Sequence, residues 1–461
     1  MVFTGIFLAT ITGFLLINVI SPKFQLCEKI GFSFPIGLFC VTMCMLLMDA
    51  VNLPITKNNI LVGMIILLVA MALLLWKKYK EIFTETKKAF TFSIGNFNTI
   101  WLIFIILIIY IENINFQKCM FWPPFDRDSL AGFETIGYVV SKEFTLKGLS
   151  LFQADYIQNI HFGPVGYITY TPMVQLSYAF VYLFGAETSK IIPALMFAFF
   201  LLAFYGISKR FINRTGAAII TFFVLMTPEM VAFSSLSMTN VIHAIYASLG
   251  IIYLSVWFKE RQKRDLYLSA LLLAINFWCR TEGILFIGAA YAVLFVDVWK
   301  KKHFKDYAFF VLITISTAII WNLFMKIHGL YAESFAITKL YLDSEKMSTI
   351  WKYMTDLYTS TQYYGLTFIV LAIGFLGNIW FLFKKRDNIY LLSLLSLSML
   401  FYMIILYQID YKWDTIQNVL MYSAKRFMFC FIPMFWFYVA SNESVRWLLN
   451  KTELFLSIKK I

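Results

Sequence analysis

Long apolar segments dominate the chain and alternate with short polar ones. A helix needs about 20 apolar residues to cross a ~30 Å hydrocarbon core. About thirteen runs in the chain approach this length. A helix satisfies all its backbone polar groups within one segment, as lipid requires, so each run is predicted to be a transmembrane helix. The runs are 2–20, 34–52, 60–76, 99–114, 190–207, 216–234, 240–257, 266–279, 284–299, 307–325, 366–383, 390–407 and 427–440.

This pattern predicts an all-α fold, a polytopic membrane helix bundle with about 13 transmembrane helices. A helical outer loop, 115–189, is expected between the fourth and fifth helices. The organisation we predict is a group of N-terminal transmembrane helices at 1–98, a second transmembrane module at 99–440 and a cytoplasmic tail at 441–461. Residues 2–20 lack a basic region and a small-residue cleavage site, so we interpret them as a retained helix and not a signal peptide.

Composition agrees with a membrane protein and argues against nucleic-acid binding. Hydrophobic residues make up 60% of the chain and charged residues 14%, whereas a soluble domain has roughly 25% charged residues. The net charge of +13 is carried by short basic clusters between the apolar runs, as the positive-inside rule expects of cytoplasmic loops. The six cysteines show no paired spacing, so no disulfide framework is expected.

Five basic clusters predict the orientation. They are Lys77, Lys78, Lys80, Lys87 and Lys88; Lys209, Arg210 and Arg214; Lys259, Arg261, Lys263 and Arg264; Lys300, Lys301, Lys302 and Lys305; and Lys384, Lys385 and Arg386. If all five are cytoplasmic, the N-terminus and the loops 115–189, 326–365 and 408–426 lie on the extracytoplasmic face.

The orientation holds only if the segment 166–185 does not cross the membrane. Its sequence, "GYITYTPMVQLSYAFVYLFG", mixes tyrosines with threonine, proline and glutamine, and such residues favour the membrane interface over the core. We therefore predict an interfacial helix on the outer face. The alternative is an ordinary crossing helix.

A dense charge cluster follows the fourth apolar run, in "FWPPFDRDSLAGFETIGYVV" (121–140). Its charged residues are Asp126, Arg127, Asp128 and Glu134. In a structural interpretation, Pro123 and Pro124 end the preceding helix, and Asp126 or Ser129 caps the next one. In a functional interpretation, the acids act where an acceptor meets a lipid-linked donor at the membrane edge.

The order of several stretches resembles the GT-C superfamily of integral membrane glycosyltransferases, which includes the protein O-mannosyltransferases and the aminoarabinose transferases that modify lipid A. The matching stretches are the acids 126–128 with "AGFETIGYVVSKE" (131–143), "HFGPVGYITYTPMVQLSYAFVYLFG" (161–185), "INFWCRTEGILFIG" (275–288) and "SAKRFMFCFIPMFWF" (423–437). The resemblance spans about 100–440, so 99–440 is interpreted as a GT-C-like catalytic module.

The resemblance implies a lipid-phosphate sugar donor and an essential aspartate early in the first long outer loop. This chain departs from the pattern, because its acids read Asp-Arg-Asp and not as an adjacent pair, and because four helices lead into the loop. The spacing to Phe133 favours Asp128 over Asp126 as the catalytic base, and Asp126 stays the alternative.

The chemistry explains the residue types. The acceptor hydroxyl needs a carboxylate to take its proton, while a phosphate leaving group needs positive charge and no acid. Candidate phosphate-binding residues are Arg426, Lys425, Arg280 and Arg127, and candidate substrate-binding residues are Glu134, His161, Tyr170 and Glu282. The alternatives are that Arg426 snorkels at the interface and that Arg280 and Glu282 simply pair with each other.

No cofactor is certain from the sequence. Neither a P-loop nor a dinucleotide-binding glycine motif is present, which fits a donor built elsewhere and delivered in the lipid. Asp126, Asp128 and His161 are candidate ligands of a divalent metal ion, although a solvated or hydrogen-bonded His161 is the simpler interpretation.

The sequence as a whole predicts an inverting membrane glycosyltransferase, a hexosyl- or pentosyltransferase of the cell envelope. It would move a sugar from a polyprenyl-phosphate donor to a lipid, glycan or protein acceptor on the extracytoplasmic face. One alternative is a lipid-linked glycan flippase or transporter, although most predicted spans lack the internal charges typical of transporters. Another is a glycan polymerase or ligase with a lipid-diphosphate donor, for which an arginine-rich late outer loop would be expected.

Overall fold

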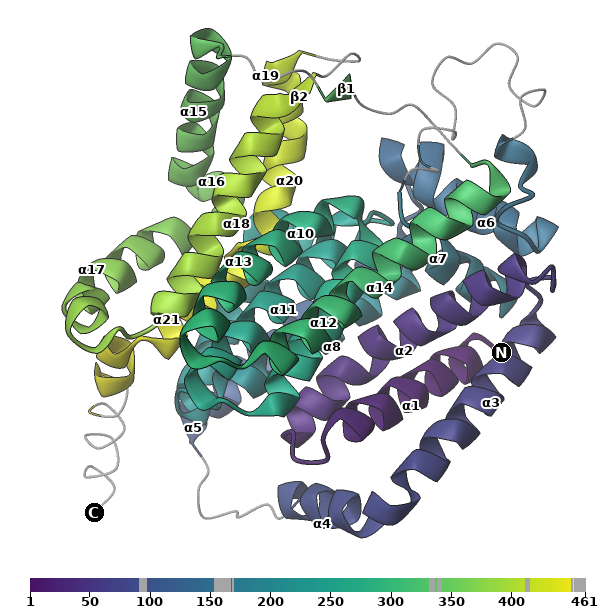
Figure 1. Cartoon of the computed structure of the whole chain (residues 1–461), viewed down its shortest axis with the longest axis horizontal. Coiled ribbons are helices and arrows are strands. Elements are labelled where there is room, and N and C mark those ends of the chain that lie inside the picture. Colours follow the sequence, from purple (N-terminus) through teal and green to yellow (C-terminus); the bar gives the residue numbers. More distant parts are fainter. Residues whose placement is uncertain are drawn as a thin grey trace.

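Helices form nearly all of the described chain, and most of them run side by side in one bundle (Figure 1). The computed structural model describes residues 1–90, 98–152, 167, 170–330, 336–337, 342–410, 415–448 and 451. Within these residues, strand pairing is limited to β1 (Ala336–Ile337) and β2 (Ile409–Asp410), which are antiparallel. The predicted all-α class is confirmed.

The helices of the first half are α1 (Val2–Ile20), α2 (Leu26–Ala50), α3 (Lys57–Leu75), η1 (Trp76–Lys78), α4 (Tyr79–Phe90), α5 (Thr99–Phe121), η3 (Ser129–Phe133), α6 (Glu134–Glu143), η4 (Ser150–Phe152), α7 (Met173–Leu183), α8 (Ile191–Ser208) and α9 (Arg214–Leu225). The others are α10 (Pro228–Phe233), α11 (Asn240–Glu260), α12 (Lys263–Cys279), η6 (Thr281–Gly283), α13 (Ile284–Lys301), α14 (Phe304–His328), α15 (Ser344–Thr359), α16 (Thr361–Tyr364), α17 (Thr367–Lys385), α18 (Ile389–Gln408), α19 (Ile416–Val419), η7 (Leu420–Ala424), α20 (Lys425–Phe427), η8 (Met428–Cys430) and α21 (Ile432–Ser441).

Ten helical segments in the described residues are long and apolar enough to cross a membrane. They coincide with ten of the predicted runs. The other three runs coincide with shorter helices: 216–234 with α9 and α10, 266–279 with α12, and 427–440 with η8 and α21. The first of these breaks because Pro228 begins α10, and proline cannot continue a helix from the preceding turn. The total of about 13 crossing helices and the boundaries at 98 and 440 stay predictions.

Helix α11 sets the length of the bundle. Its residues 240–258 are all buried, and at 1.5 Å per residue its 21 residues rise about 31 Å. This length matches the ~30 Å hydrocarbon core of a bilayer. A helix this apolar and this enclosed lies at the centre of the bundle, and its two ends mark two polar regions.

Ion pairs gather at the end of the bundle where α11 finishes, which we call the basic end. Arg210 contacts Glu28 at 2.8 Å and Asp265 at 2.9 Å, and Arg261 binds both oxygens of Asp297 at 2.7 and 2.8 Å. Further pairs here join Lys259 to Asp387, Lys263 to Asp306, Lys301 to Asp297, and Lys385 to Glu443. Four of the five predicted basic clusters therefore meet at one end.

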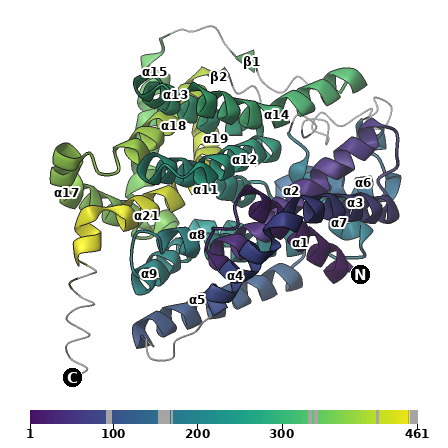
Figure 2. The ribbon, with the colours of Figure 1, turned by 60° about the horizontal axis from the view of Figure 1, so that its bottom comes forward.

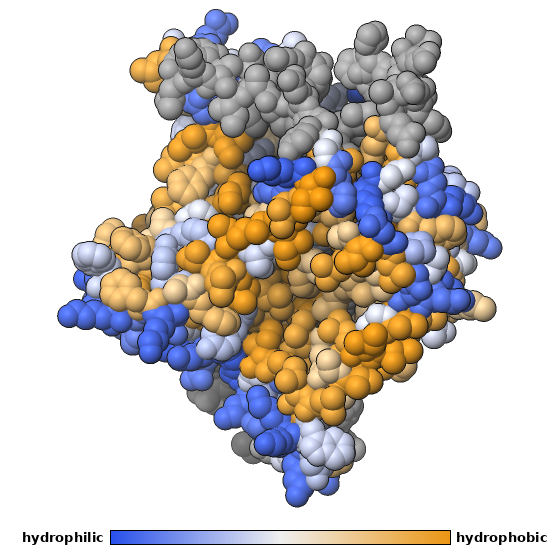
Figure 3. Space-filling model, turned by 45° about the vertical axis from the view of Figure 1, so that its right-hand side comes forward, coloured by the Kyte–Doolittle hydropathy of each residue, from blue (hydrophilic) through white to orange (hydrophobic). Residues whose placement is uncertain are grey.

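The fifth cluster lies at the same end. It occupies η1 and α4, beside the turn that joins α1 to α2 (Figures 1 and 2), and the carboxylates of Glu81 and Glu85 act on Lys29 near the start of α2. Figure 3 shows a broad apolar area with hydrophilic side chains gathered on two opposite sides of it. Charge is thus separated along the bundle as the orientation argument requires.

Helix α7 lies within the segment 166–185, on which the orientation depends. Its 11 residues rise about 16 Å, half of what a crossing helix needs. Residues 173–181 are all buried, in contact with α6 and α2. Helix α7 is therefore shorter than a membrane-crossing helix, and protein encloses its residues 173–181, which the prediction of an interfacial helix did not anticipate. That the segment does not cross stays a prediction.

Two glycines let α1 and α2 pack in direct contact. A Cβ atom added to Gly37 would lie 1.8 Å from the carbonyl oxygen of Ala9, and one added to Gly13 would lie 1.8 Å from the carbonyl oxygen of Ser33. Small residues at such crossings are how helices approach closely in membranes.

We expect Gly37→Ala to lower the midpoint of thermal unfolding, because the added methyl group forces the backbones apart and overpacking costs about 1–3 kcal/mol. The matched control is Gly377→Ala in α17, where the nearest atom would lie 3.9 Å away. Thermal unfolding in one detergent measures both. Equal midpoints for the two variants would contradict the close crossing.

Candidate active site

Asp126 caps the helix that follows the fourth span. Its Oδ1 accepts a hydrogen bond from the backbone N–H of Ser129 at 2.8 Å, and its Oδ2 accepts one from the Ser129 hydroxyl at 2.6 Å. Side-chain oxygens do this at helix N-termini because the first N–H groups have no partner within the helix. The structural interpretation of Asp126 agrees with this geometry.

Asp128 has different partners. Its Oδ2 lies 2.7 Å from a guanidinium N–H of Arg426, and its Oδ1 accepts a hydrogen bond from the Tyr167 hydroxyl at 3.1 Å. Thirty per cent of the Asp128 side chain is exposed, so other molecules can reach it. Arg426 is held in place by a second bond, from its Nε to the Tyr422 carbonyl at 2.9 Å.

Both residues adjoin π-helical turns. Asp128 immediately precedes η3, and Arg426 is the second residue after η7. Turns of this kind are rare in proteins and occur often at functional sites. The sequence spacing alone does not reveal either turn.

Tyr167 is positioned by its neighbours. It packs edge-on against Phe133 and stacks on Tyr170, and a Cβ atom at Gly132 would lie 2.4 Å from its ring. Burial, and then the Asp128 carboxylate, raise the pKa of the Tyr167 hydroxyl well above its ordinary value. The phenol therefore stays neutral and donates to Asp128.

A second ion pair lies next to Tyr170. Arg280 and Glu282 bond to each other, as the pairing alternative predicts, and Arg280 also reaches the Thr239 hydroxyl at 3.3 Å. Burial would lower the pKa of Arg280, but the Glu282 carboxylate raises it above its ordinary value. The guanidinium carbon lies 5.3 Å from the centre of the Tyr170 ring.

Tyr170 thus connects the two pairs. Burial raises the pKa of its hydroxyl, and the charges of Arg280, Glu282, Asp128 and Arg426 all act on it. We call these five residues together with Tyr167 the acid–tyrosine cluster. It lies where α12 ends and just before α11 begins, at the end of the bundle opposite the basic end.

The remaining predicted residues have other partners, are exposed or fall outside the described residues. Lys425 pairs with Glu229 at 2.9 Å and lies 4.5 Å from the Tyr363 ring centre. Arg127 is exposed. His161 lies outside the described residues, so its predicted substrate contact stays untested.

Glu134 faces the protein interior, not the cluster. It is 8% exposed, and its Oε1 accepts a bond from the Tyr182 hydroxyl. Its Oε2 is buried with no hydrogen-bond partner among the described residues. This position favours a structural role for Glu134, in which it holds α6 against α7, over contact with a substrate.

Sequence reasoning missed two charged residues at this end, Lys190 and Glu229. Lys190 is 1% exposed, its ammonium donates to the Trp122 carbonyl at 2.8 Å, and the charges of Glu134 and Asp126 act on it. A signal was available, because Lys190 begins an apolar run and Glu229 interrupts one, and charged residues in such runs are functional candidates.

The described residues do not test the metal prediction. Asp126 is bonded to Ser129, and Asp128 is bonded to Arg426 and Tyr167. No group of three or more His, Cys, Asp or Glu side chains able to hold a metal ion occurs among the residues that the structure describes. Because His161 is not among them, the site formed by Asp126, Asp128 and His161 stays a prediction.

The fold and the cluster define a multi-pass membrane protein with a carboxylate-bearing site at one end of its bundle. Residues 171–321 match the model of the family described as dolichyl-phosphate-mannose-protein mannosyltransferase, a GT-C type family of membrane glycosyltransferases. The predicted resemblance to the GT-C superfamily is therefore confirmed. No curated protein and no solved structure matches the chain.

The match supports a membrane glycosyltransferase with a polyprenyl-phosphate sugar donor. It covers about a third of the chain and includes Arg280 and Glu282. Asp128 and Arg426 lie outside the matched segment, so their roles rest on geometry and chemistry.

We expect Gly132→Ala to lower the midpoint of thermal unfolding, because its methyl group would collide with the Tyr167 ring and overpacking costs about 1–3 kcal/mol. If that collision is the cause, Gly132→Ala costs little in a Tyr167→Ala background, which a double-mutant cycle measures. The control is Gly377→Ala in α17, whose nearest contact would be 3.9 Å. Equal losses in both backgrounds would place the cause elsewhere.

Proposed function

We propose that this protein transfers a sugar, with inversion, from a polyprenyl phosphate to an acceptor on the extracytoplasmic face of the membrane, and that Asp128 is the general base. The observation that carries the proposal is the contact between Asp128 and Arg426 beside Tyr167. It joins a carboxylate able to take a proton to a guanidinium able to bind a phosphate.

One displacement accounts for the reaction. The acceptor oxygen attacks the anomeric carbon of the sugar as the bond from that carbon to the phosphate oxygen breaks. Asp128 takes the proton of the acceptor hydroxyl, and the polyprenyl phosphate leaves as an anion without needing an acid. Attack opposite the leaving group inverts the anomeric centre, because no covalent sugar–enzyme intermediate intervenes.

The geometry supports Asp128 over Asp126 as the base. Both oxygens of Asp126 are committed to the helix cap at Ser129. Each Asp128 oxygen has one partner among the described residues and has a lone pair left to accept a second hydrogen bond. The partly exposed carboxylate can therefore accept a hydroxyl proton while Tyr167 holds it in position.

Arg426 is the phosphate-binding residue that we favour. A guanidinium forms paired hydrogen bonds with phosphate. Among the described residues, only one terminal nitrogen of Arg426 bonds to Asp128. A bound phosphate would compete with Asp128 for Arg426. Donor binding would then release one Asp128 oxygen for the acceptor, so the base becomes available only when the donor is in place.

The other predicted cations have supporting parts in this proposal. Arg280 is neutralised by Glu282 and faces Tyr170, so we assign this pair to holding the tyrosine beside the reacting groups. Lys425 is paired with Glu229, and Arg127 is exposed at the edge of the site. Both could attract an anionic donor without touching the reacting atoms.

The extracytoplasmic assignment rests on charge separation. The basic clusters meet at the end of α11 opposite the acid–tyrosine cluster, and basic loops of membrane proteins are retained in the cytoplasm. This separation supports our proposal that Asp128 lies on the outer face.

The two aspartates provide a sharp test, because asparagine caps a helix about as well as aspartate but cannot take a proton. We expect Asp128→Asn to lower turnover by roughly 10²-fold or more and Asp126→Asn to keep most activity. The measurement is release of free polyprenyl phosphate by the purified protein in lipid, supplied with polyprenyl-phosphate sugars and a cell-envelope acceptor. The reverse order of the two variants would make Asp126 the base, and full activity in both would refute the site.

Arg426→Gln should weaken donor use, because a hydrogen bond to a charged group is worth about 1.5–3 kcal/mol, which corresponds to roughly 10- to 100-fold in kcat/KM for the donor. The effect should appear in the dependence on donor concentration and not on acceptor concentration. Arg446→Gln, an arginine at the basic end, controls for loss of charge. An unchanged donor dependence for Arg426→Gln would remove Arg426 from the phosphate site.

A further inference from the structure

The chain just before α8 contacts the segment that carries Asp128 at a point upstream of it. Lys190 is 1% exposed, and its ammonium donates a hydrogen bond to the carbonyl of Trp122 at 2.8 Å. Trp122 directly follows the last residue of α5. The bond therefore holds the chain where it leaves the fourth span. The backbone N–H of Lys190 is fixed in turn by the Thr188 hydroxyl, which accepts from it at 3.2 Å.

Ser189, the residue before Lys190, reaches the segment downstream of Asp128 through Ser237. The hydroxyls of Ser189 and Ser237 lie 2.9 Å apart, and the Ser237 carbonyl accepts a hydrogen bond from the Ser129 hydroxyl at 2.9 Å. All three serines are buried, and hydrogen bonds between buried groups are stronger than those exposed to water. Two consecutive residues thus hold the chain on both sides of Asp128.

The ammonium of Lys190 also meets the negative charge of this segment. The carboxylates of Asp126 and Glu134 both act on it. A buried ammonium is costly unless opposite charge compensates it, and here the compensating charge lies just before and just after η3. The attraction therefore holds this acidic part of the chain against the start of α8.

In the proposed reaction, Asp128 needs such a support. A donor phosphate that binds Arg426 takes away the partner at 2.7 Å and leaves Asp128 the Tyr167 hydroxyl at 3.1 Å. A base must lie within hydrogen-bond distance of the proton that it takes. The position of the carboxylate then depends more strongly on the backbone on its two sides.

We propose that Lys190 is a positioning residue for Asp128. Together with Ser189 it holds the segment 122–129 against the start of α8, an arrangement that we call the α8 clamp. The clamp keeps the Asp128 carboxylate within reach of the acceptor hydroxyl after Arg426 has bound the donor. This inference rests on the proposed function, in which Asp128 is the base.

Turnover measures the effect of the clamp on the base. We expect Lys190→Met to lower kcat by roughly 10- to 100-fold, because a misplacement of about 1 Å can cost 10²-fold in rate. The KM for the donor should stay unchanged, because the Tyr422 carbonyl holds Arg426 separately. Lys190→Arg keeps a cation and a hydrogen-bond donor and should restore part of the loss. In an Asp128→Asn background, Lys190→Met should cost little more, because residues that act as a unit do not add.

Hydrogen exchange measures the clamp without any substrate. The readout is amide exchange of the peptide 122–134, followed by mass spectrometry on the purified full-length protein in lipid. We expect Lys190→Met and Ser189→Ala each to speed this exchange, because the segment opens locally more easily without its contacts. Ser189→Ala is the smaller change and keeps the test decisive if Lys190→Met does not fold.

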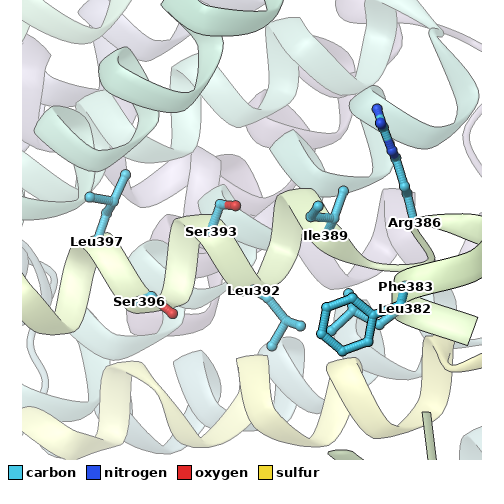
Figure 4. Close-up of a pocket in the computed structure, with 8 residues that line it drawn as sticks. All are labelled: Leu382, Phe383, Arg386, Ile389, Leu392, Ser393, Ser396 and Leu397. Atoms are coloured by element: carbon cyan, nitrogen blue, oxygen red, sulfur yellow. The ribbon is translucent and has the colours of Figure 1, made fainter. Parts of the chain in front are cut away.

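The matched controls lie at the basic end. Lys29 is also 1% exposed, and the carboxylates of Glu81 and Glu85 act on it. Ser393 lines a groove of about 570 Å³ between α17 and α18 (Figure 4). We expect Lys29→Met to lower the midpoint of thermal unfolding, and we expect neither Lys29→Met nor Ser393→Ala to change kcat or the exchange of 122–134.

The outcomes separate the clamp from the proposed function. Unchanged exchange in both clamp variants would overturn the proposal, and so would faster exchange with an unchanged kcat. An equal loss of kcat in Lys29→Met would assign the effect to general instability and overturn it as well. Full activity of Asp128→Asn would refute the proposed base, whereas the exchange measurement tests the clamp by itself.

Discussion

In a membrane protein, a charged side chain needs contact with water or with an opposite charge. This constraint divides the molecule into two polar ends that are separated by the length of α11. Helix α11, buried from residue 240 to 258, rises about 31 Å. At one of its ends Arg261 binds Asp297, and at the other Thr239, the residue before it, meets Arg280. The acid–tyrosine cluster and the basic end are consequences of the same separation.

The acid–tyrosine cluster depends on contacts between distant segments. Asp128 follows the fourth span, Tyr167 belongs to the segment before α7, and Arg426 lies in α20 near the end of the chain. The contact between Asp128 and Arg426 spans 298 positions of sequence. A site assembled in this way forms only when the bundle is complete. Packing between distant helices, such as the glycine contact of α1 with α2, therefore also supports the proposed active site.

Much of the fold was predictable because its signals are local. Length and hydropathy identified the ten long helices, since a run of apolar residues needs no partner to be recognised. The cap formed by Asp126 and the pair formed by Arg280 and Glu282 were also within reach, because their partners lie two or three residues away. The enclosure of α7 was not, since nothing in its own sequence names the helices around it.

By itself, the sequence determined the helical membrane class, the clustering of basic residues and the residue types that phosphate-linked sugar transfer needs. Only the tertiary structure decided which of two neighbouring aspartates caps a helix and which contacts a cation. Both lie in one Asp-Arg-Asp triplet, and local spacing treats them almost alike. The difference comes from Arg426 and Tyr167, which the fold brings to Asp128 and not to Asp126. The physical reason is that helix packing decides which side of the turn at 126–128 faces α20.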